Sequence, residues 1–199
     1  MEIRDVLQAL EEEALAAGVP ILRESEREAL LTACVSAAPK RILEIGTAVG
    51  FSALLMAERC PGAEIDTVEL DPDRHARAVR ATADAGCAGS IRCHLGDAAD
   101  IIPSLSGPYD FLYLDGPKGQ YLRHLHLAEP LLSPRAVIAA DNVLFRGLVE
   151  SGDPVPHRYR TLVMRLRDYL AYVRTHYDTA IHPEGDGLAV SRKKEERYE

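Results

Sequence analysis

Apolar positions follow two different spacings along the chain. Continuous apolar runs predict buried strands in five places: residues 41–45, 64–70, 90–95, 109–115 and 136–141. Between these runs the apolar spacing is that of a helix, at residues 52–59, 71–85 and about 118–132. Strands that alternate with helices imply a mostly parallel sheet with helices on both faces, so we expect a doubly wound α/β fold.

Both ends of the chain depart from this alternation. Residues 1–15 have helical spacing, and a second helix is expected after Ser25. Beyond a loop rich in Gly, Pro and Asp, residues 157–176 form a long amphipathic segment that predicts a helix. Two predicted strands, 177–183 and 187–193, meet at a Glu-Gly-Asp-Gly turn. An antiparallel hairpin would therefore complete a sheet of seven strands.

The composition narrows the class of protein. The chain has 199 residues, 47% hydrophobic and 27% charged, which suits a single domain over residues 1–199. No apolar run reaches the roughly 18 residues that cross a bilayer, and the acidic amino-terminal segment is unlike a signal peptide. The four cysteines have neither metal-ligand nor disulfide spacing, so we expect a cytoplasmic protein with reduced thiols. The net charge of −8 argues against a broad nucleic-acid surface and leaves room for a local basic face.

Glycines mark the end of the first predicted strand, in Glu-Ile-Gly-Thr-Ala-Val-Gly at residues 44–50. Glycine lets a backbone approach a ligand closely, and ligands bind at the carboxyl ends of such strands. The spacing is G-x-x-x-G rather than the G-x-G-x-x-G of nicotinamide sites, which favours a ligand without a pyrophosphate. A plain turn from strand to helix is the alternative.

Acidic side chains end the first three predicted strands. Glu44 ends the first, and Glu69 ends the second, where a carboxylate can accept both ribose hydroxyls of an adenosine. Asp97 follows the third strand, where it either accepts the adenine amino group or caps the next helix. For Glu69 the alternative is a helix-capping turn with Asp71 and Pro72. The three acidic positions together are more informative than any one of them.

Further polar side chains end the fourth and fifth predicted strands. Asp115, Asp141 and Asn142 offer three side-chain oxygens, half of an octahedral shell for a hard cation such as Mg²⁺. Open positions would remain for water and substrate, although Asp and Asn also commonly start turns. Lys118 follows three residues after Asp115, where a dication and partial burial would disfavour its ammonium form and make it a candidate base. The histidines show no ligand spacing, and His124 is expected on a helix surface.

Several motifs, taken in order, resemble one known family. RILEIGTAVGFSA, TVELD, LGDA, FLYLDGPKGQY and ADNVLFRG are similar to the cation-dependent O-methyltransferases, which include the catechol and caffeoyl-coenzyme A O-methyltransferases. The resemblance covers nearly the whole chain and implies the Rossmann-like fold of class I methyltransferases, whose parallel sheet ends in an antiparallel hairpin. GVPIL, LFRGLV and GDGLAVS look most like the bacterial tRNA 5-hydroxyuridine methyltransferases.

The resemblance also implies roles for individual residues. It implies that Asp115, Asp141 and Asn142 bind Mg²⁺ or another divalent cation, and that Lys118 acts with Asp115 in catalysis. It implies helices over residues 1–38 that cover the cofactor site, and a homodimer. Contacts with S-adenosylmethionine are implied at Leu22, Glu44, Gly46, Ser52, Glu69, Ala98 and Asp115, and Asp97 is added to them from its position after the third strand.

The chain departs from the family pattern in two places. Residues 115–118 are Asp-Gly-Pro-Lys where the family often has Asp-Ala-x-Lys, so a proline stiffens the approach to the lysine. Residues 134–136 are Pro-Arg-Ala where Pro-Gly-Gly is usual, which alters a turn. Neither departure touches the expected metal ligands.

The expected function is methyl transfer from S-adenosylmethionine to an oxygen of a substrate with two adjacent oxygens, held by the metal. Both 5-hydroxyuridine in tRNA and a small catechol meet this requirement. The resemblance favours the tRNA, and five arginines after the fifth strand could steer an RNA backbone to the mouth of the site: Arg146, Arg158, Arg160, Arg165 and Arg167. Without the resemblance, a solvated helix face balanced by Asp168 and Glu150 is the favoured interpretation of these arginines. A catechol O-methyltransferase is the alternative, and an NAD-dependent oxidoreductase is the alternative of another class.

Overall fold

The structure is a computed structural model that describes residues 2–17, 22 and 24–194. Within these residues, seven strands form one sheet in the order β3-β2-β1-β4-β5-β7-β6. The strands are β1 (Arg41–Ile45), β2 (Glu64–Glu69), β3 (Ile91–Leu95), β4 (Tyr109–Leu114), β5 (Leu132–Ala140), β6 (Tyr177–His182) and β7 (Leu188–Lys193). The first five run parallel, and β7 pairs antiparallel with both β5 and β6. The expected doubly wound sheet with its antiparallel hairpin is confirmed.

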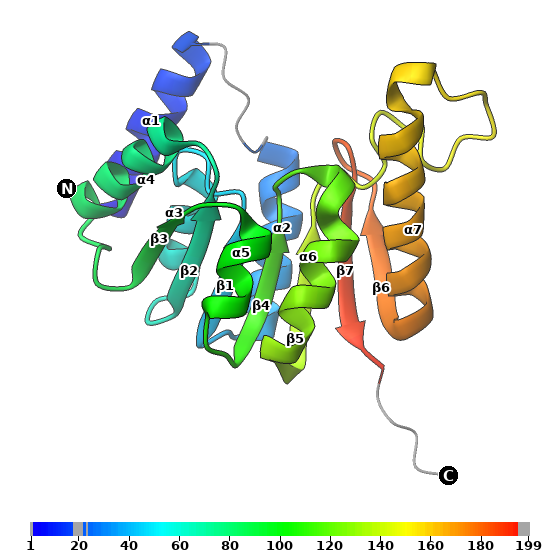
Figure 1. The fold of residues 1–199 in the computed structure, drawn as a ribbon. Coiled ribbons are helices and arrows are strands. Elements are labelled where there is room, and N and C mark those ends of the chain that lie inside the picture. The colour runs from blue at the N-terminus through cyan, green and yellow to red at the C-terminus, as the bar shows by residue number, and fades with distance from the viewer. Residues whose placement is uncertain (1, 18–21, 23, 195–199) are drawn as a thin grey trace.

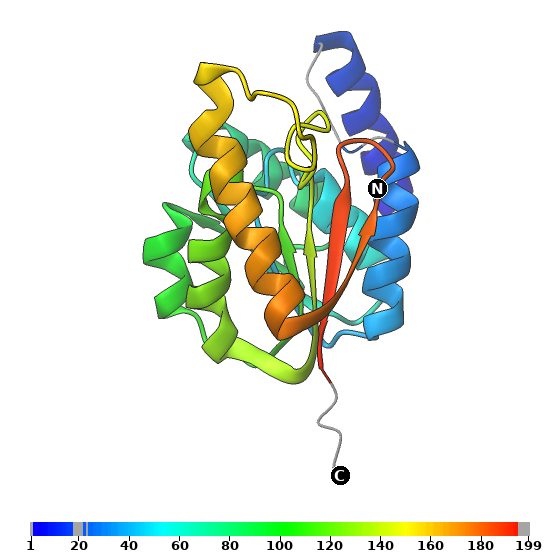
Figure 2. The ribbon, with the colours of Figure 1, turned by 90° about the vertical axis from the view of Figure 1, so that its right-hand side faces the viewer.

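Helices cover both faces of the sheet (Figures 1 and 2). The longer ones are α1 (Ile3–Ala17), α2 (Glu24–Ala37), α3 (Phe51–Arg59), α4 (Pro72–Asp84), α6 (Tyr121–Ala128) and α7 (Arg160–His176). Short helical turns are α5 (Ala98–Ile101), η1 (Ile102–Ser104), η2 (Lys118–Gln120), η3 (Glu129–Leu131) and η4 (His157–Tyr159). One apolar core lies between one face of the sheet and the helices α1, α2, α3 and α4. A second core lies between the other face and α5, α6 and α7. Of the described helices, none is long and apolar enough to cross a membrane.

Three segments differ from the sequence prediction. The helix α2 begins at Glu24, so Ser25 lies in its first turn instead of preceding it. The helix expected over 118–132 is divided into η2, α6 and η3. The α6 segment ends before Pro130, which has no amide hydrogen to continue it. Strand β5 begins at Leu132, four residues before the predicted start at 136, and its pairing with β4 shifts register there. That bulge accommodates Pro134, which cannot donate to a regular strand ladder.

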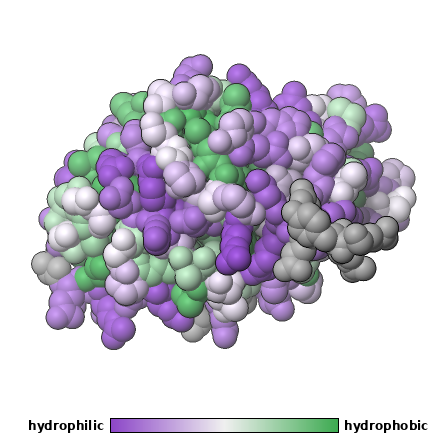
Figure 3. Space-filling model, turned by 90° about the horizontal axis from the view of Figure 1, so that it is seen from below, coloured by the Kyte–Doolittle hydropathy of each residue, from purple (hydrophilic) through white to green (hydrophobic). Residues whose placement is uncertain are grey.

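A buried carboxylate on β2 joins four neighbouring strands of the sheet. Asp66 on β2 accepts hydrogen bonds from Arg41 on β1 (2.9 Å), Tyr109 on β4 (2.8 Å) and His94 on β3 (2.8 Å). Burial alone would raise the pKa of Asp66, but these bonds outweigh it and lower the pKa to about 2. Figure 3 shows the side of the molecule on which the parallel strands begin, and its outer surface mixes hydrophilic and hydrophobic residues.

The Asp66 network predicts a loss of stability in acid. The folded pKa of about 2 lies below the ordinary value of 3.8, so the stabilisation is present above pH 3.8 and disappears as pH falls toward 2. We expect Asp66→Asn to lower the free energy of unfolding by about 2 kcal/mol at pH 7, and the difference from wild type to shrink below pH 4. Urea unfolding at a series of pH values measures both. Asp178→Asn, at an exposed position on β6, is the matched control, and a difference that stays constant to pH 2.5 would contradict the assignment.

Candidate active site

The carboxyl ends of the parallel strands meet at one edge of the sheet, where two cavities lie side by side. The first has a volume of about 560 Å³ and is bordered by residues that follow β1, β2, β3 and β4. The second has a volume of about 380 Å³ and is bordered by α2, α3 and the residues that follow β1, β4 and β5. Four residues belong to the walls of both: Gly46, Ala48, Arg74 and Asp115. The two cavities therefore form one continuous candidate site.

Gly46 brings the ends of β1 and β4 into contact. Its φ angle is +104°, and a Cβ atom there would lie 2.6 Å from the carbonyl oxygen of Asp115. The Asp115 amide in turn donates to the carbonyl of Ile45 at 2.9 Å. Only glycine permits this approach, so Gly46 fixes where Asp115 sits between the cavities. The close approach expected at this glycine is thus made to the neighbouring strand end, and its contact with a ligand stays a prediction.

Glu44 lies behind the cavity wall and orients a residue that lines the second cavity. Its side chain is fully buried and accepts hydrogen bonds from the hydroxyls of Ser52 and Thr67, each at 2.5 Å. Burial raises the pKa of Glu44 to about 7. Of the two side chains, Ser52 lines the second cavity, and Glu44 lines neither cavity. The structure thus places Ser52 at the second cavity and Glu44 behind it, as the acceptor that orients Ser52.

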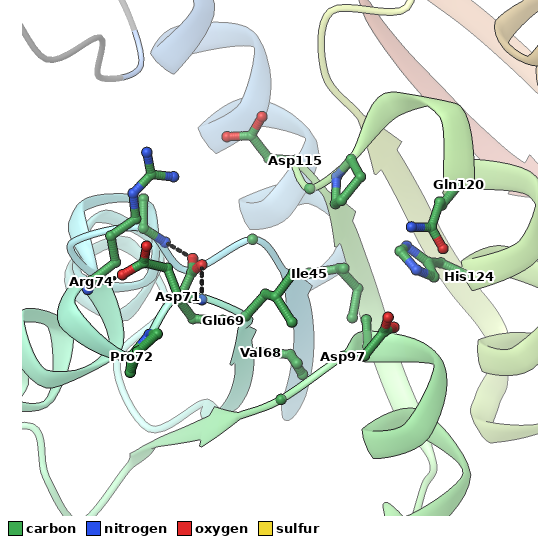
Figure 4. A pocket seen from close by; sticks show the side chains of 17 residues that line it. Ile45, Val68, Glu69, Asp71, Pro72, Arg74, Asp97, Asp115, Gln120 and His124 are labelled. Atoms are coloured by element: carbon green, nitrogen blue, oxygen red, sulfur yellow. Dashed lines mark hydrogen bonds between the residues drawn. The ribbon is translucent and has the colours of Figure 1, made fainter. Parts of the chain in front are cut away.

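Acidic side chains stand at opposite ends of the first cavity (Figure 4). Glu69 accepts from the amides of Ala48 (2.7 Å) and Asp71 (2.9 Å). Asp71, rather than Glu69, caps α4. At the other end Asp97 accepts from the Ala99 amide at 2.8 Å and so caps α5, while it also borders the cavity. The capping interpretation of Asp97 is therefore confirmed, and its contact with an adenine amino group stays a prediction.

The expected metal ligands and the expected base line the second cavity together: Asp115, Lys118, Asp141 and Asn142. Asp141 is 3% exposed and accepts from the amide of Asn142 at 2.7 Å. Asn142 has a φ angle of +53°, a left-handed conformation that asparagine tolerates better than most residues. The structure thus collects residues from two strand ends and the start of η2 at one cavity wall.

Acidic side chains crowd together at this wall, and their ionisation is disfavoured. Burial, with the neighbouring Asp141 carboxylate next in importance, raises the pKa of Asp115 to about 8. Burial also raises the pKa of Asp141 to about 6, and the nearby Glu26 carboxylate on α2 adds to the effect. The Lys118 ammonium acts in the opposite direction on both. A bound cation would relieve this repulsion, so the donor set fits a divalent metal.

The expected metal site needs a ligand other than carboxylate, thiolate or imidazole groups. No group of three His, Cys, Asp or Glu side chains suited to a metal occurs within the described part of the chain. The expected donor set instead combines two carboxylates with the amide oxygen of Asn142. Such an all-oxygen set suits hard cations and leaves positions open for other ligands.

The other predicted contacts divide between the cavities. Leu22 and Ser52 line the second cavity, and Ala98 lines the first. Leu22 is the one residue of the GVPIL motif that the structure describes, and the rest of the motif lies outside the described residues. The stretch Leu-Phe-Arg-Gly-Leu-Val forms the loop after Asn142, whose Leu144 amide donates to the carbonyl of Asp186 at 2.9 Å.

Some cavity residues were not found from the sequence, among them His124, Glu26 and Arg74. His124 was expected on a helix surface, and this was wrong: it is 1% exposed and lines the first cavity. The helical spacing of the buried α6 residues Tyr121, His124, Leu125 and Ala128 carried that information. Glu26 and Arg74 gave no comparable signal, because each lies on a helix among other charged residues.

The sheet topology and the paired cavities at its carboxyl edge define a class I methyltransferase. The chain belongs to the O-methyltransferase family, because the model of that family matches residues 3–194. It is similar to a catechol O-methyltransferase of Niastella koreensis, with 32% identity over 94% of this chain and 89% of the relative. The expected class of enzyme, an S-adenosylmethionine-dependent O-methyltransferase, is confirmed, and the NAD-dependent alternative loses its support.

Solved structures resemble the whole chain. One is a Staphylococcus aureus protein provisionally described as a caffeoyl-CoA O-methyltransferase, with 26% identity over 94% of this chain and 92% of the other and a TM-score of 0.86. Another is the O-methyltransferase TomG of Streptomyces achromogenes, described in complex with S-adenosylmethionine. It has 25% identity over 95% of this chain and 89% of the other and a TM-score of 0.79.

Proposed function

We propose that the protein transfers the methyl group of S-adenosylmethionine to an acceptor with two adjacent oxygens, with a divalent cation held by Asp115, Asp141 and Asn142. One observation carries the proposal: these three residues and Lys118 line a single cavity that shares Asp115 with the neighbouring cavity. A donor in the first cavity and an acceptor in the second would meet at Asp115.

The first cavity suits the adenosine part of the donor. Glu69 uses both carboxylate oxygens to accept backbone amides, yet a carboxylate has about four acceptor positions, so capacity remains for ribose hydroxyls. Ile45 and Val68 lie between Glu69 and Asp97 and offer an apolar surface to a flat base (Figure 4). The order of these side chains matches a ribose at one end and a base at the other.

The second cavity suits the transfer step. When bound, a divalent cation supplies polarisation of the acceptor oxygens and increases the acidity of the attacking hydroxyl. Lys118 borders the same cavity, and in its neutral amine form it would take the proton from that hydroxyl. The methyl group then passes from sulfur to oxygen, and the products are a methyl ether, S-adenosylhomocysteine and a protonated lysine.

For the acceptor we propose 5-hydroxyuridine in tRNA. The support is a cluster of arginine and aromatic side chains, Phe145, Arg146, Arg158 and Tyr159, that begins three residues after Asn142. Phe145 and Tyr159 pack edge to face at 5.3 Å, and the guanidinium carbons of Arg158 and Arg146 lie 4.6 and 5.8 Å from the centre of the Tyr159 ring. Surfaces of this kind bind phosphates and stack on unpaired bases.

Not every basic residue near the mouth contributes to this cluster. Arg167 donates to the carbonyls of Leu148, Val149 and Ser151, so it anchors the loop after β5. Arg160 and Arg165 donate to the carbonyls of Val155 and Gly119. A small catechol is the second candidate acceptor, because the relative from Niastella koreensis is a catechol O-methyltransferase.

The deciding experiment offers both acceptors to the purified enzyme with labelled S-adenosylmethionine and Mg²⁺. One set of reactions contains tRNA from cells that lack the enzyme, and the other contains a panel of catechols. We expect label in tRNA, and we expect Arg158→Ala to reduce it while Arg160→Ala changes it little. Turnover of catechols without transfer to tRNA would replace the tRNA proposal by the catechol one, and no transfer to either would contradict the proposed function.

A further inference from the structure

His124 is a buried polar side chain without a partner. It lies on α6, is 1% exposed, and neither ring nitrogen has a hydrogen-bond partner among the described residues. Leaving a buried polar atom unpaired costs stability, and buried polar groups in folded proteins nearly always find a partner. A group that is unpaired beside a cavity therefore points to a ligand that enters that cavity.

The cavity beside His124 is the first one. Figure 4 shows His124 on α6 and Gln120 on η2 at the same end of this cavity as Asp97, and Glu69 and Asp71 at the far end. The His124 ring therefore stands at the end where a flat base would lie if the ribose lies at Glu69.

The ring has the hydrogen-bonding groups that a base requires. Burial lowers the pKa of His124, although the Asp97 carboxylate opposes this, so the imidazole is neutral at pH 7. A neutral imidazole has one N–H donor and one bare nitrogen that accepts. The edge of adenine likewise offers an amino donor and ring-nitrogen acceptors.

We propose that His124 hydrogen-bonds to the edge of the adenine base of the methyl donor and contributes to the selection of adenine. The inference rests on the proposed function only in placing the donor in the first cavity. Its competitor is a purely structural histidine whose nitrogens are paired by water.

The first test measures binding of S-adenosylhomocysteine by isothermal titration calorimetry. We expect His124→Leu to weaken binding about tenfold or more, because one hydrogen bond in a buried site is lost. His124→Asn, which keeps a donor and an acceptor, should lose less. His126→Leu is the matched control, since His126 lies on the same helix, is exposed and packs on Tyr172. The melting temperature of unliganded His124→Leu should equal or exceed that of wild type, because the unpaired nitrogens are gone.

The second test alters the ligand and needs no change in fold. Analogues of S-adenosylhomocysteine with carbon in place of N1, N3 or N7, or without the amino group, are titrated against wild type and His124→Leu. We expect one analogue to bind wild type about tenfold more weakly and to bind His124→Leu as well as the parent compound does.

The outcomes separate the two proposals. Equal binding of S-adenosylhomocysteine by wild type and His124→Leu, or equal losses for every analogue in both proteins, would overturn the His124 inference and leave the proposed function standing. Failure of wild type to bind S-adenosylhomocysteine at all would overturn the donor placement and the His124 inference together.

Discussion

Asp141→Ala is expected to abolish methyl transfer while S-adenosylhomocysteine still binds within about threefold of wild type. Asp141 is 3% exposed in the wall of the second cavity and does not border the first, so its loss removes a proposed metal ligand without altering the proposed donor cavity. Metal polarisation contributes several kcal/mol, and each 1.36 kcal/mol is tenfold in rate, so turnover should fall at least about 10³-fold. Single-turnover assays with saturating donor and Mg²⁺ measure the loss.

Metal binding gives a readout that does not depend on turnover. The folded pKa of Asp141, about 6, lies above the ordinary value of 3.8, so the stability that depends on its protonation is full below pH 3.8 and lost as pH rises through 6. Above pH 6 the Asp141 carboxyl is ionised, so a bound cation has a charge to neutralise. At pH 8, Mg²⁺ should raise the melting temperature of wild type and of the exposed control Asp178→Ala, and leave that of Asp141→Ala unchanged. Turnover by Asp141→Ala within tenfold of wild type would rule out the metal mechanism.

Lys118→Met is expected to lower kcat by about 10²- to 10⁴-fold, the usual range for loss of a general base. The side chain borders the second cavity beside Asp115 and Asp141, and methionine keeps its length without a nitrogen that can take a proton. Binding of S-adenosylhomocysteine and the melting shift with Mg²⁺ should both persist. Rapid-quench measurement of the methylated product gives the rate of transfer.

A second substitution separates proton transfer from charge. Lys118→Arg keeps a positive charge near the two aspartates, but a guanidinium does not give up its proton in proteins and so cannot act as a base. It should therefore be as slow as Lys118→Met, while Lys193→Met, on β7, behaves as wild type. Near-normal transfer by Lys118→Arg would show that Lys118 acts only through its charge.

Local patterns were sufficient to predict the sheet and the strand ends that carry the site. Parallel strands place their carboxyl ends at one edge, so Asp115, Asp141 and Asn142 could be grouped from their positions after two strands. Lys118 followed from its nearness to Asp115 along the chain.

Residues that depend on packing between distant elements were harder to predict. Glu26 reaches the second cavity only because α2 packs beside the ends of β4 and β5, and Arg74 borders both cavities from α4. The role of Glu44 as a support for Ser52 needed the fold of β1 against α3. His124 is different, because it shares a helical spacing with the apolar positions of α6, and this spacing predicts burial. A surface position was expected only because histidine is polar.

The shared wall at Gly46 and Asp115 has a thermodynamic consequence. If the donor occupies the first cavity and a cation the second, each changes the charge and packing around Asp115, so their binding is linked by one coupling free energy. By reciprocity, whatever factor the cation applies to the affinity for donor, the donor applies to the affinity for cation. Neither ligand then has a single dissociation constant: each has two, according to whether its neighbour is already bound.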